Sequence, residues 1–137
     1  SSLNLSHNQL GGAIPSSLGH FSQLNFLALD NNQFNGSIPN SIGYIEQLHT
    51  LNLNNNQLSG FIPKSLEKLQ QLQQFDISNN QLTGLSPTFL NNLGQSIHLN
   101  WSNNKFIDVA TDNADKWSVT TMVTIGVAIG IIFLLLL

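Results

Sequence analysis

The sequence repeats with a period of 24 residues, and this feature limits the fold more than any other. Five copies align without insertion or deletion, as LNLSHNQLGGAIP, LALDNNQFNGSIP, LNLNNNQLSGFIP, FDISNNQLTGLSP and LNWSNNKFIDVAT. They begin at Leu3, Leu27, Leu51, Phe75 and Leu99. Apolar residues hold the same columns in each copy, and one column between them is always asparagine. A fixed period of this length predicts a solenoid of stacked units, because each unit covers the apolar side of the next.

The first half of each copy predicts a short strand followed by a sharp bend. The Leu-x-Leu pattern turns two apolar side chains inward, and stacked copies then form one parallel sheet. The constant asparagine falls at the bend. We expect its amide to bond backbone groups of its own and adjacent turns, since a buried amide without partners costs roughly 1–3 kcal/mol. This predicted structural ladder consists of Asn8, Asn32, Asn56, Asn80 and Asn104. Neighbours such as Asn54 and Asn55 are expected to face solvent without a structural role.

The second half of each copy predicts an extended segment and then a short helical turn. All four prolines of the chain lie in one column, at Pro15, Pro39, Pro63 and Pro87. Proline fixes φ and lacks a backbone donor, so we expect the segment from the recurring glycine to the proline to be extended and not a central strand. Apolar residues follow at a spacing of three, which predicts a 3₁₀ or helical turn with its apolar side toward the core.

These columns, LxxLxLxxNxLxGxIPxxLGxLxxL, resemble the 24-residue plant-type leucine-rich repeat over residues 1–110, in about five copies. The resemblance implies an α/β solenoid, in which a right-handed coil carries a parallel sheet on its concave side and 3₁₀ or helical turns on its convex side. Members of this family are mostly extracellular and recognise ligands, often as ectodomains of receptor-like kinases and receptor-like proteins. Others are secreted inhibitors of cell-wall-degrading enzymes, and a few are antifreeze proteins.

The last 19 residues, 119–137, carry no charge and read VTTMVTIGVAIGIIFLLLL. As a helix they would span about 28 Å at roughly 1.5 Å per residue, close to the roughly 30 Å hydrocarbon core of a bilayer. Trp117 stands at the edge, where an interfacial indole is expected. The alternative, a helix buried in a soluble core, is disfavoured because a solenoid of five repeats has no cavity for it. The sequence therefore predicts a single transmembrane helix over residues 118–137, after a juxtamembrane linker over residues 111–117.

Two explanations of the end of the chain remain open. We expect the sequence to be a fragment truncated inside or just after the transmembrane helix, because it also starts within a repeat. The alternative is a cleaved lipid-anchor signal, for which residues 113–115 supply small side chains before a polar spacer and an apolar end. Within the helix, Gly126 and Gly130 form a GxxxG motif that would allow two helices to approach and dimerise. The same spacing also arises by coincidence in glycine-containing helices.

Composition and charge exclude several classes of function. Charged residues make up 8% of the chain, against about 25% in typical proteins, and the formal net charge is −3. Without a basic patch, nucleic-acid binding is not expected.

Histidines of alternate repeats lie about 10 Å apart in the predicted sheet, which is too far for shared zinc ligation. No nucleophile–base pair or phosphate-binding loop is evident, so we expect no catalysis, no metal and no cofactor.

Three sequons place candidate glycosylation sites at Asn4, Asn35 and Asn100. The Asn, Ser and Thr content alone predicts about three such triplets by chance, so they say little about the compartment.

The outward side chains of the predicted strands form a grid that is rich in amides and hydroxyls and weakly acidic. Such a face suits hydrogen bonding to a peptide, protein or carbohydrate better than to a polyanion. The predicted ligand-binding residues are Phe26, Ala28, Asp30, His49, Asn52, Asn54, Gln74, Asp76, Ser78, His98 and Asn100. The alternative is that these side chains only keep the sheet soluble and that ligand contacts lie upstream.

Together these features predict a membrane-anchored recognition module, a fragment of a leucine-rich-repeat receptor. We expect a single-pass protein of the cell membrane whose repeats are extracellular and whose helix contacts lipid, with a co-receptor or a second copy as partner through that helix. Two other classes remain open. One is a secreted or lipid-anchored inhibitor of cell-wall-degrading enzymes, and the other is a structural or ice-binding protein that uses the regular Asn/Ser array.

Overall fold

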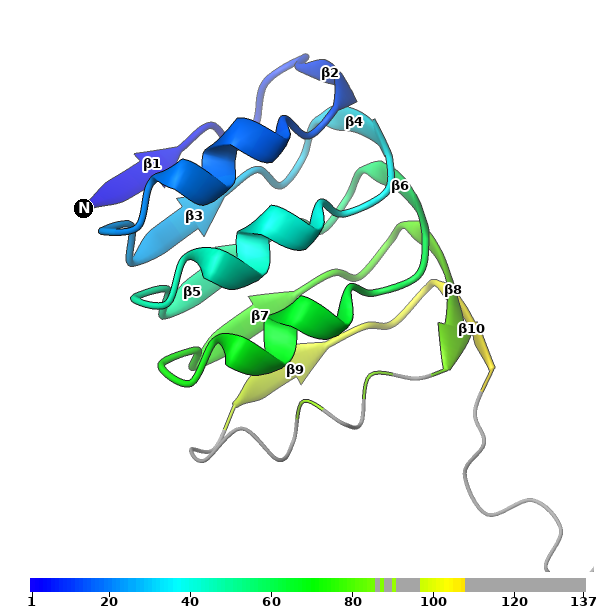
Figure 1. The fold of residues 1–137 in the computed structure, drawn as a ribbon. Coiled ribbons are helices and arrows are strands. Elements are labelled where there is room, and N and C mark those ends of the chain that lie inside the picture. Colours follow the sequence, from blue (N-terminus) through cyan, green and yellow to red (C-terminus); the bar gives the residue numbers. More distant parts are fainter. Residues whose placement is uncertain (86, 88–89, 91–96, 108–137) are drawn as a thin grey trace, which may run out of the picture.

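The chain winds into a coil in which each repeat forms one turn (Figure 1). The structure, a computed structural model, describes residues 1–85, 87, 90 and 97–107. Two parallel sheets and a row of 3₁₀ helices form three sides of the coil. We call the sheet formed by the Leu-x-Leu strands the first sheet and the other the second sheet.

The first sheet contains five parallel strands in the order β1-β3-β5-β7-β9. These strands are β1 (Ser2–Asn4), β3 (Phe26–Ala28), β5 (Thr50–Asn52), β7 (Gln74–Asp76) and β9 (His98–Asn100). Equivalent residues of successive repeats are paired, so Leu27 is the partner of Leu3 and of Leu51. The predicted parallel sheet of stacked copies is therefore confirmed.

The second sheet was not predicted, and it also contains five parallel strands, in the order β10-β8-β6-β4-β2. Its strands are β2 (Gly11–Ala13), β4 (Gln33–Gly36), β6 (Gln57–Gly60), β8 (Gln81–Leu85) and β10 (Lys105–Ile107). The sheet is formed mainly by residues before the recurring glycine: β4 and β6 end at Gly36 and Gly60, and β2 and β8 end one residue after their glycine. Most of the segment from the glycine to the proline is therefore outside the strands, as expected. The strands end before the prolines, so the missing donor of proline never interrupts the sheet.

In the described part of the chain, three 3₁₀ helices cover the side between the sheets, as the spacing of apolar residues predicted. They are η1 (Ser16–His20), η2 (Asn40–Tyr44) and η3 (Lys64–Lys68), and each follows a proline that has φ between −63° and −66°. The helices stack closely, because a Cβ atom on Gly43 would overlap the backbone of Ser65 in the next turn. The Ser65 hydroxyl donates to the carbonyl oxygen of Asn40 at 2.7 Å, which ties η3 to η2.

The core is one apolar cluster enclosed by these three sides. Leucine and isoleucine columns from successive turns fill it, and residues such as Leu51 and Leu66 are fully buried. The end turns are less covered, because each has a neighbouring turn on one side in the described part of the chain. Phe21 is one of the apolar residues that follow the prolines at a spacing of three and were expected to face the core. It is instead 56% exposed, whereas its equivalents Ile45 and Leu69 are buried.

The asparagine column ties successive turns together, as Asn56 illustrates. Its Nδ2 donates to the carbonyl oxygens of Leu53 in its own turn and Leu29 in the preceding turn, at 3.1 Å and 3.0 Å. Its Oδ1 accepts from the backbone N–H of Phe34 at 2.9 Å. The same pattern recurs at Asn32, Asn80 and Asn104. Asn8, in the first turn, bonds carbonyl oxygens of its own turn.

The residue before each ladder asparagine has a left-handed backbone. This column consists of His7, Asn31, Asn55, Asn79 and Asn103, with φ between 54° and 56°. Asparagine adopts this conformation more readily than most residues, so the column creates the bend between the two sheets. The expectation that Asn55 lacks a structural role was wrong, because it makes this bend. Asn54 contributes its main-chain carbonyl, which accepts from the backbone N–H of Asn31 at 3.0 Å.

The predicted linker over 111–117 and the predicted transmembrane helix over 118–137 lie outside the described residues. Among the residues that are described, no helix is long and apolar enough to cross a membrane.

Candidate functional site

The outward side chains of the first sheet form two columns that run across its strands. One column contains Phe26, Thr50, Gln74 and His98, and the other contains Ala28, Asn52, Asp76 and Asn100. The parallel register brings most of the predicted ligand-binding residues onto one surface. His49 is an exception in its position, and Ala28 and Ser78 are exceptions in their burial.

His49 was predicted to flank the outward columns, and it lies outside both of them. It precedes β5, and Thr50 is the residue paired with Phe26 and Gln74. The His49 ring nitrogen Nδ1 lies 2.7 Å from the carbonyl oxygen of Gln47, beside the sheet. Thr50 was therefore missed, although counting 24 residues from Phe26 would have found it.

Ala28 and Ser78 are buried, being 2% and 4% exposed, so they offer little surface to a ligand. The methyl group of Ala28 occupies the register position between the longer side chains of Asn4 and Asn52. The hydroxyl of Ser78 donates to Oδ1 of Asp76 at 2.7 Å. Both belong to the floor of the surface, and the residues around them form its contactable part.

Three strands end in a turn in which a side-chain oxygen bonds the residue two positions later. Asp76 Oδ1 accepts from the backbone N–H of Ser78 at 2.9 Å, and Asn100 and Asn4 bond Ser102 and Ser6 in the same way. Asx-Ser pairs at this spacing stabilise turns. Two of the three sequons therefore also have a backbone role, and Asn4 and Asn100 are both exposed. The third candidate, Asn35, is exposed on β4 of the second sheet.

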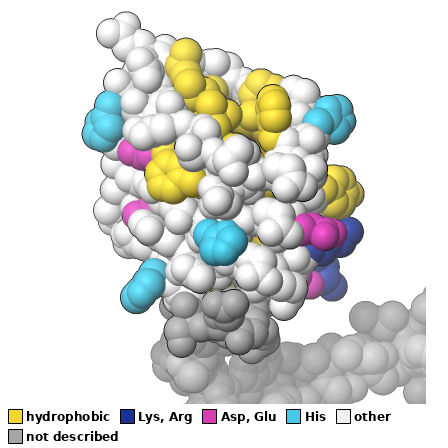
Figure 2. All heavy atoms as spheres, turned by 90° about the vertical axis from the view of Figure 1, so that its left-hand side faces the viewer, with side chains coloured by type: hydrophobic (Ala, Val, Ile, Leu, Met, Phe, Trp, Pro, Cys, Tyr) yellow, Lys and Arg dark blue, Asp and Glu magenta, His cyan; other side chains and the backbone are white. Residues whose placement is uncertain are grey.

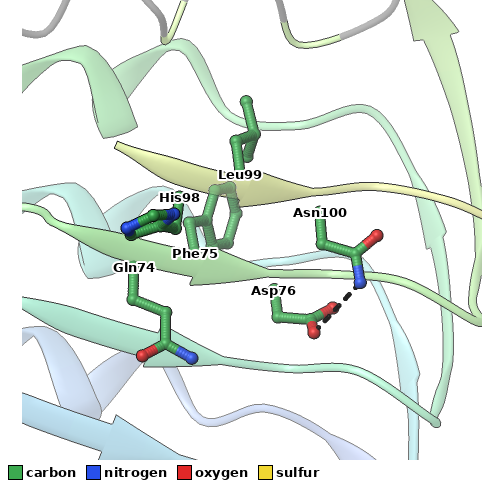
Figure 3. Close-up of a pocket in the computed structure, with 6 residues that line it drawn as sticks. All are labelled: Gln74, Phe75, Asp76, His98, Leu99 and Asn100. Carbon is green, nitrogen blue, oxygen red and sulfur yellow. Dashed lines mark hydrogen bonds between the residues drawn. The ribbon is translucent and has the colours of Figure 1, made fainter. Parts of the chain in front are cut away.

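A hollow of about 290 Å³ lies over strands β7 and β9, lined by Gln74, Phe75, Asp76, His98, Leu99 and Asn100. Figure 3 shows Gln74 and His98 at one end and the hydrogen-bonded pair of Asp76 and Asn100 at the other. Nδ2 of Asn100 donates to Oδ2 of Asp76 at 3.2 Å. Asp76 thus accepts three hydrogen bonds, which hold its carboxylate in a fixed position at the rim of the hollow.

Charge on this surface is weakly negative. Asp76 is the last residue of β7, Asp30 lies two residues after β3, and none of the described strands of the first sheet contains lysine or arginine. Asp30 approaches His7, with its Oδ2 atom 3.8 Å from Nε2. Figure 2 shows the histidines at separate places on the surface that it displays. Within the described ranges, no group of three or more His, Asp or Glu side chains is placed to hold a metal ion.

Asn52 and Asn54 occupy the middle of the surface and are half-buried. The Oδ1 atom of Asn52 is buried without a hydrogen-bond partner. Its turn differs from those of Asp76 and Asn100, because residue 54 is asparagine where they have serine. The predicted helix-dimerisation residues Gly126 and Gly130 lie outside the described residues.

Models of the leucine rich repeat match residues 1–21, 23–45 and 46–106. No curated protein sequence matches the chain.

Several solved structures of plant proteins are similar to the chain. The plant peptide hormone receptor RGFR1 in complex with RGF2 has a TM-score of 0.75 and 35% identity, over 90% of this chain and 20% of that one. A second similar structure is the ectodomain of the membrane receptor kinase GASSHO1/SCHENGEN3 from Arabidopsis thaliana, in complex with CASPARIAN STRIP INTEGRITY FACTOR 2. Its TM-score is 0.70 and its sequence identity 34%, and the match covers 77% of this chain and 13% of that one. A plant ice-binding protein has a TM-score of 0.73 and 28% sequence identity, over 77% of this chain and 34% of that one. The chain spans about a third or less of each of these proteins.

Proposed function

Because the chain belongs to the leucine-rich repeat family, we propose that it is a non-catalytic recognition module of the plant receptor type, which binds a peptide or protein on the first sheet. The hollow over β7 and β9 is the observation that carries this proposal. It combines exposed amide and imidazole side chains with a half-buried carboxylate in one surface depression. Similar structures include a peptide hormone receptor and a receptor kinase ectodomain, each in a complex.

The chemistry of the hollow favours an extended peptide with a cationic group. A carboxylate has about four acceptor positions, and three of those on Asp76 are used by Ser78 and Asn100. A ligand ammonium or guanidinium would complete the set with a charge-assisted hydrogen bond. Gln74 and His98 line the other end of the hollow and are exposed, so they would bond the peptide backbone.

We also propose that residues 118–137 anchor the module in the cell membrane as a single helix, with the repeats on the extracellular side. The uncharged run of 19 residues supports this anchor, as does the similarity to the ectodomain of a membrane receptor kinase. Lipid would then surround the helix, and a co-receptor or a second copy would pair with it through Gly126 and Gly130.

Peptide selection would test the recognition surface. The full chain in nanodiscs would be used to select binders from a displayed random-peptide library, and single synthetic peptides would then be titrated. We expect the selected peptides to carry net positive charge. Replacing Asp76 with Asn and Gln74 and His98 with Ala should weaken their binding at least tenfold, which is about 1.4 kcal/mol.

The matched control replaces Gln57 and Gln81, which are exposed at the starts of β6 and β8 on the second sheet. The Gln57→Ala, Gln81→Ala variant should bind the same peptides as tightly as the original chain. Peptides that bind the Asp76, Gln74 and His98 variant unchanged would contradict the proposed surface.

Ice binding is a second candidate, favoured by the similarity to a plant ice-binding protein. The column of Asn31, Asn55, Asn79 and Asn103 places amides at the spacing of adjacent strands, about 4.8 Å, and Asn103 Nδ2 donates to Oδ1 of Asn79. Thermal hysteresis of the chain, lost when Asn55 and Asn79 become Asp, would favour this function. Ordinary freezing behaviour would leave peptide recognition as the sole candidate.

A further inference from the structure

Side chains on and beside the second sheet change from small or polar to large and apolar along the coil. The residue after the recurring glycine is Ala13 in the first turn and Ser37 in the second, but Phe61 in the third and Leu85 in the fourth. A neighbouring column changes in the same direction, through Gly11, Asn35, Ser59, Thr83 and Ile107. The repeat pattern itself does not require large apolar residues at these positions, because the early turns form the same strands without them.

Phe61, Leu85 and Ile107 form one exposed apolar patch. They are 72%, 63% and 66% exposed, the highest values among the large apolar side chains described. The Phe61 ring lies over Gly84, where its Cδ1 atom would be 2.5 Å from an added Cβ. Leu85 follows Gly84 directly and is paired with Ile107 across β8 and β10. We call these three residues the apolar patch.

The charge of the strands of the second sheet suits a lipid surface. The five strands of the second sheet contain no acidic residue, and their one charged residue is Lys105. Lys105 is exposed and lies two residues before Ile107 on β10. Apolar side chains that enter the boundary between headgroups and acyl chains, with a cation beside them for the phosphates, are the combination by which proteins bind bilayer surfaces.

The apolar patch is also at the end of the coil nearest in sequence to the uncharged run. β10 ends at Ile107, and the run begins at Val119. Residues 108–118 reach at most about 40 Å when extended, so an inserted run would keep the patch close to the bilayer. Three side chains are far fewer than the roughly 20–30 residues on each side of a stable protein interface. A patch of three side chains would therefore bind weakly by itself. A membrane tether compensates for this weak binding, because it raises the effective concentration of the patch at the bilayer surface.

We propose that the apolar patch rests on the surface of the lipid bilayer and holds the coil at a fixed tilt. This inference rests on the proposed membrane anchor. The first sheet occupies a different side of the coil from the second (Figure 1), so its polar surface remains open to solvent in this orientation. The tilt would restrict the directions from which a ligand on another protein reaches the hollow.

Lipid quenching of a fluorescent label would test the contact in the full chain. The chain has no cysteine, so Thr83→Cys places one label on β8 beside the patch, and Asn35→Cys places a matched label on β4. The protein would be inserted in phosphatidylcholine vesicles that contain lipid spin-labelled near the headgroup. We expect at least threefold more quenching at position 83 than at position 35. Adding Phe61→Ser, Leu85→Ser and Ile107→Ser should reduce quenching at 83 to the level at 35.

Each other outcome would reject the docking contact, the membrane anchor or the role of the apolar patch. Equal, weak quenching at both positions in protein that resists carbonate extraction would reject the docking contact but keep the anchor. Protein that carbonate extracts would reject the anchor and the docking together. A blue-shifted label at position 83 that lipid does not quench would show that protein covers the patch, either residues 119–137 folded back or a second copy. Quenching that persists in the triple variant would reject the patch as the cause.

Discussion

The first and third turns of the coil follow the same sequence pattern but differ in how much of it they bury. Leu51 in the third turn is fully buried, whereas its equivalent Leu3 is only partly buried. Asn56 bonds backbone groups of two turns, and Asn8 bonds those of one. Since the local sequence is so alike, the difference comes from the neighbours. The contact between turns, more than the single turn, is the unit that stabilises this protein.

Because each column supplies a matched pair of positions, substitutions can measure this difference directly. Stability would be measured as the free energy of unfolding of the full chain in detergent, from urea denaturation followed by circular dichroism.

The largest effect is expected at the apolar column. Leu51→Ala removes a fully buried side chain that packs between two turns, and it should lower the free energy of unfolding by about 3–4 kcal/mol. Leu3→Ala, at a partly exposed position, should cost less than half as much. Equal losses of unfolding free energy at the two positions would show that stability is set within each turn and would contradict the role of contacts between turns.

A smaller but still large effect is expected at the asparagine ladder. Asn80→Ala leaves the N–H of Leu58 and the carbonyl oxygen of Leu53 without their side-chain partner, in a buried site. The loss should be about 2–3 kcal/mol. Asn8→Ala is the control, because its hydrogen bonds are exposed and water can replace the amide. A loss at Asn8 as large as at Asn80 would contradict the role of contacts between turns.

Much of the fold could be predicted from the sequence, because the 24-residue period identifies equivalent residues and the apolar columns identify the side that faces the core. The second sheet could not be predicted in this way. Its strands are three to five residues long, and β2, β4, β6 and β8 contain the recurring glycine, so no single copy carries a strand pattern. Their hydrogen bonds come from neighbouring turns. The left-handed backbone at Asn55 was missed for a related reason, since a run of three asparagines does not show which one bends.

The candidate site was predicted less completely than the fold. Parallel register places Phe26, Gln74 and His98 on one face, which the period alone indicates. Burial on that face depends on the length of adjacent side chains and on turns such as that of Asp76 and Ser78. The 24-residue period predicts neither the length of adjacent side chains nor these turns. Ala28 and Ser78 were therefore expected at the surface, although both are buried.

The close stacking of the 3₁₀ helices should give an intermediate effect. Gly43→Ala places a methyl group against the backbone of Ser65 and forces η2 and η3 apart, which should cost about 2 kcal/mol. Gly11→Ala, in the first turn, is the control. An added Cβ there would lie 3.5 Å from the nearest atom, an ordinary contact, so the change should be neutral. If both substitutions are neutral, the turns can separate without loss and the stacking contributes little.

The smallest effect is expected where the strain is within the turn itself. Asn55 has a left-handed backbone with φ of 54°, and its side chain is exposed. Asn55→Ala should lower the free energy of unfolding by about 1 kcal/mol, because alanine disfavours this conformation. Asn55→Gly should be nearly neutral, because glycine adopts it freely. His7→Gly would extend the test to the first turn, where φ is 56°. Similar changes in the free energy of unfolding at positions 7 and 55 would show that each turn makes its backbone bend alone. The bend would then differ from the packing and ladder contacts, which require a neighbouring turn.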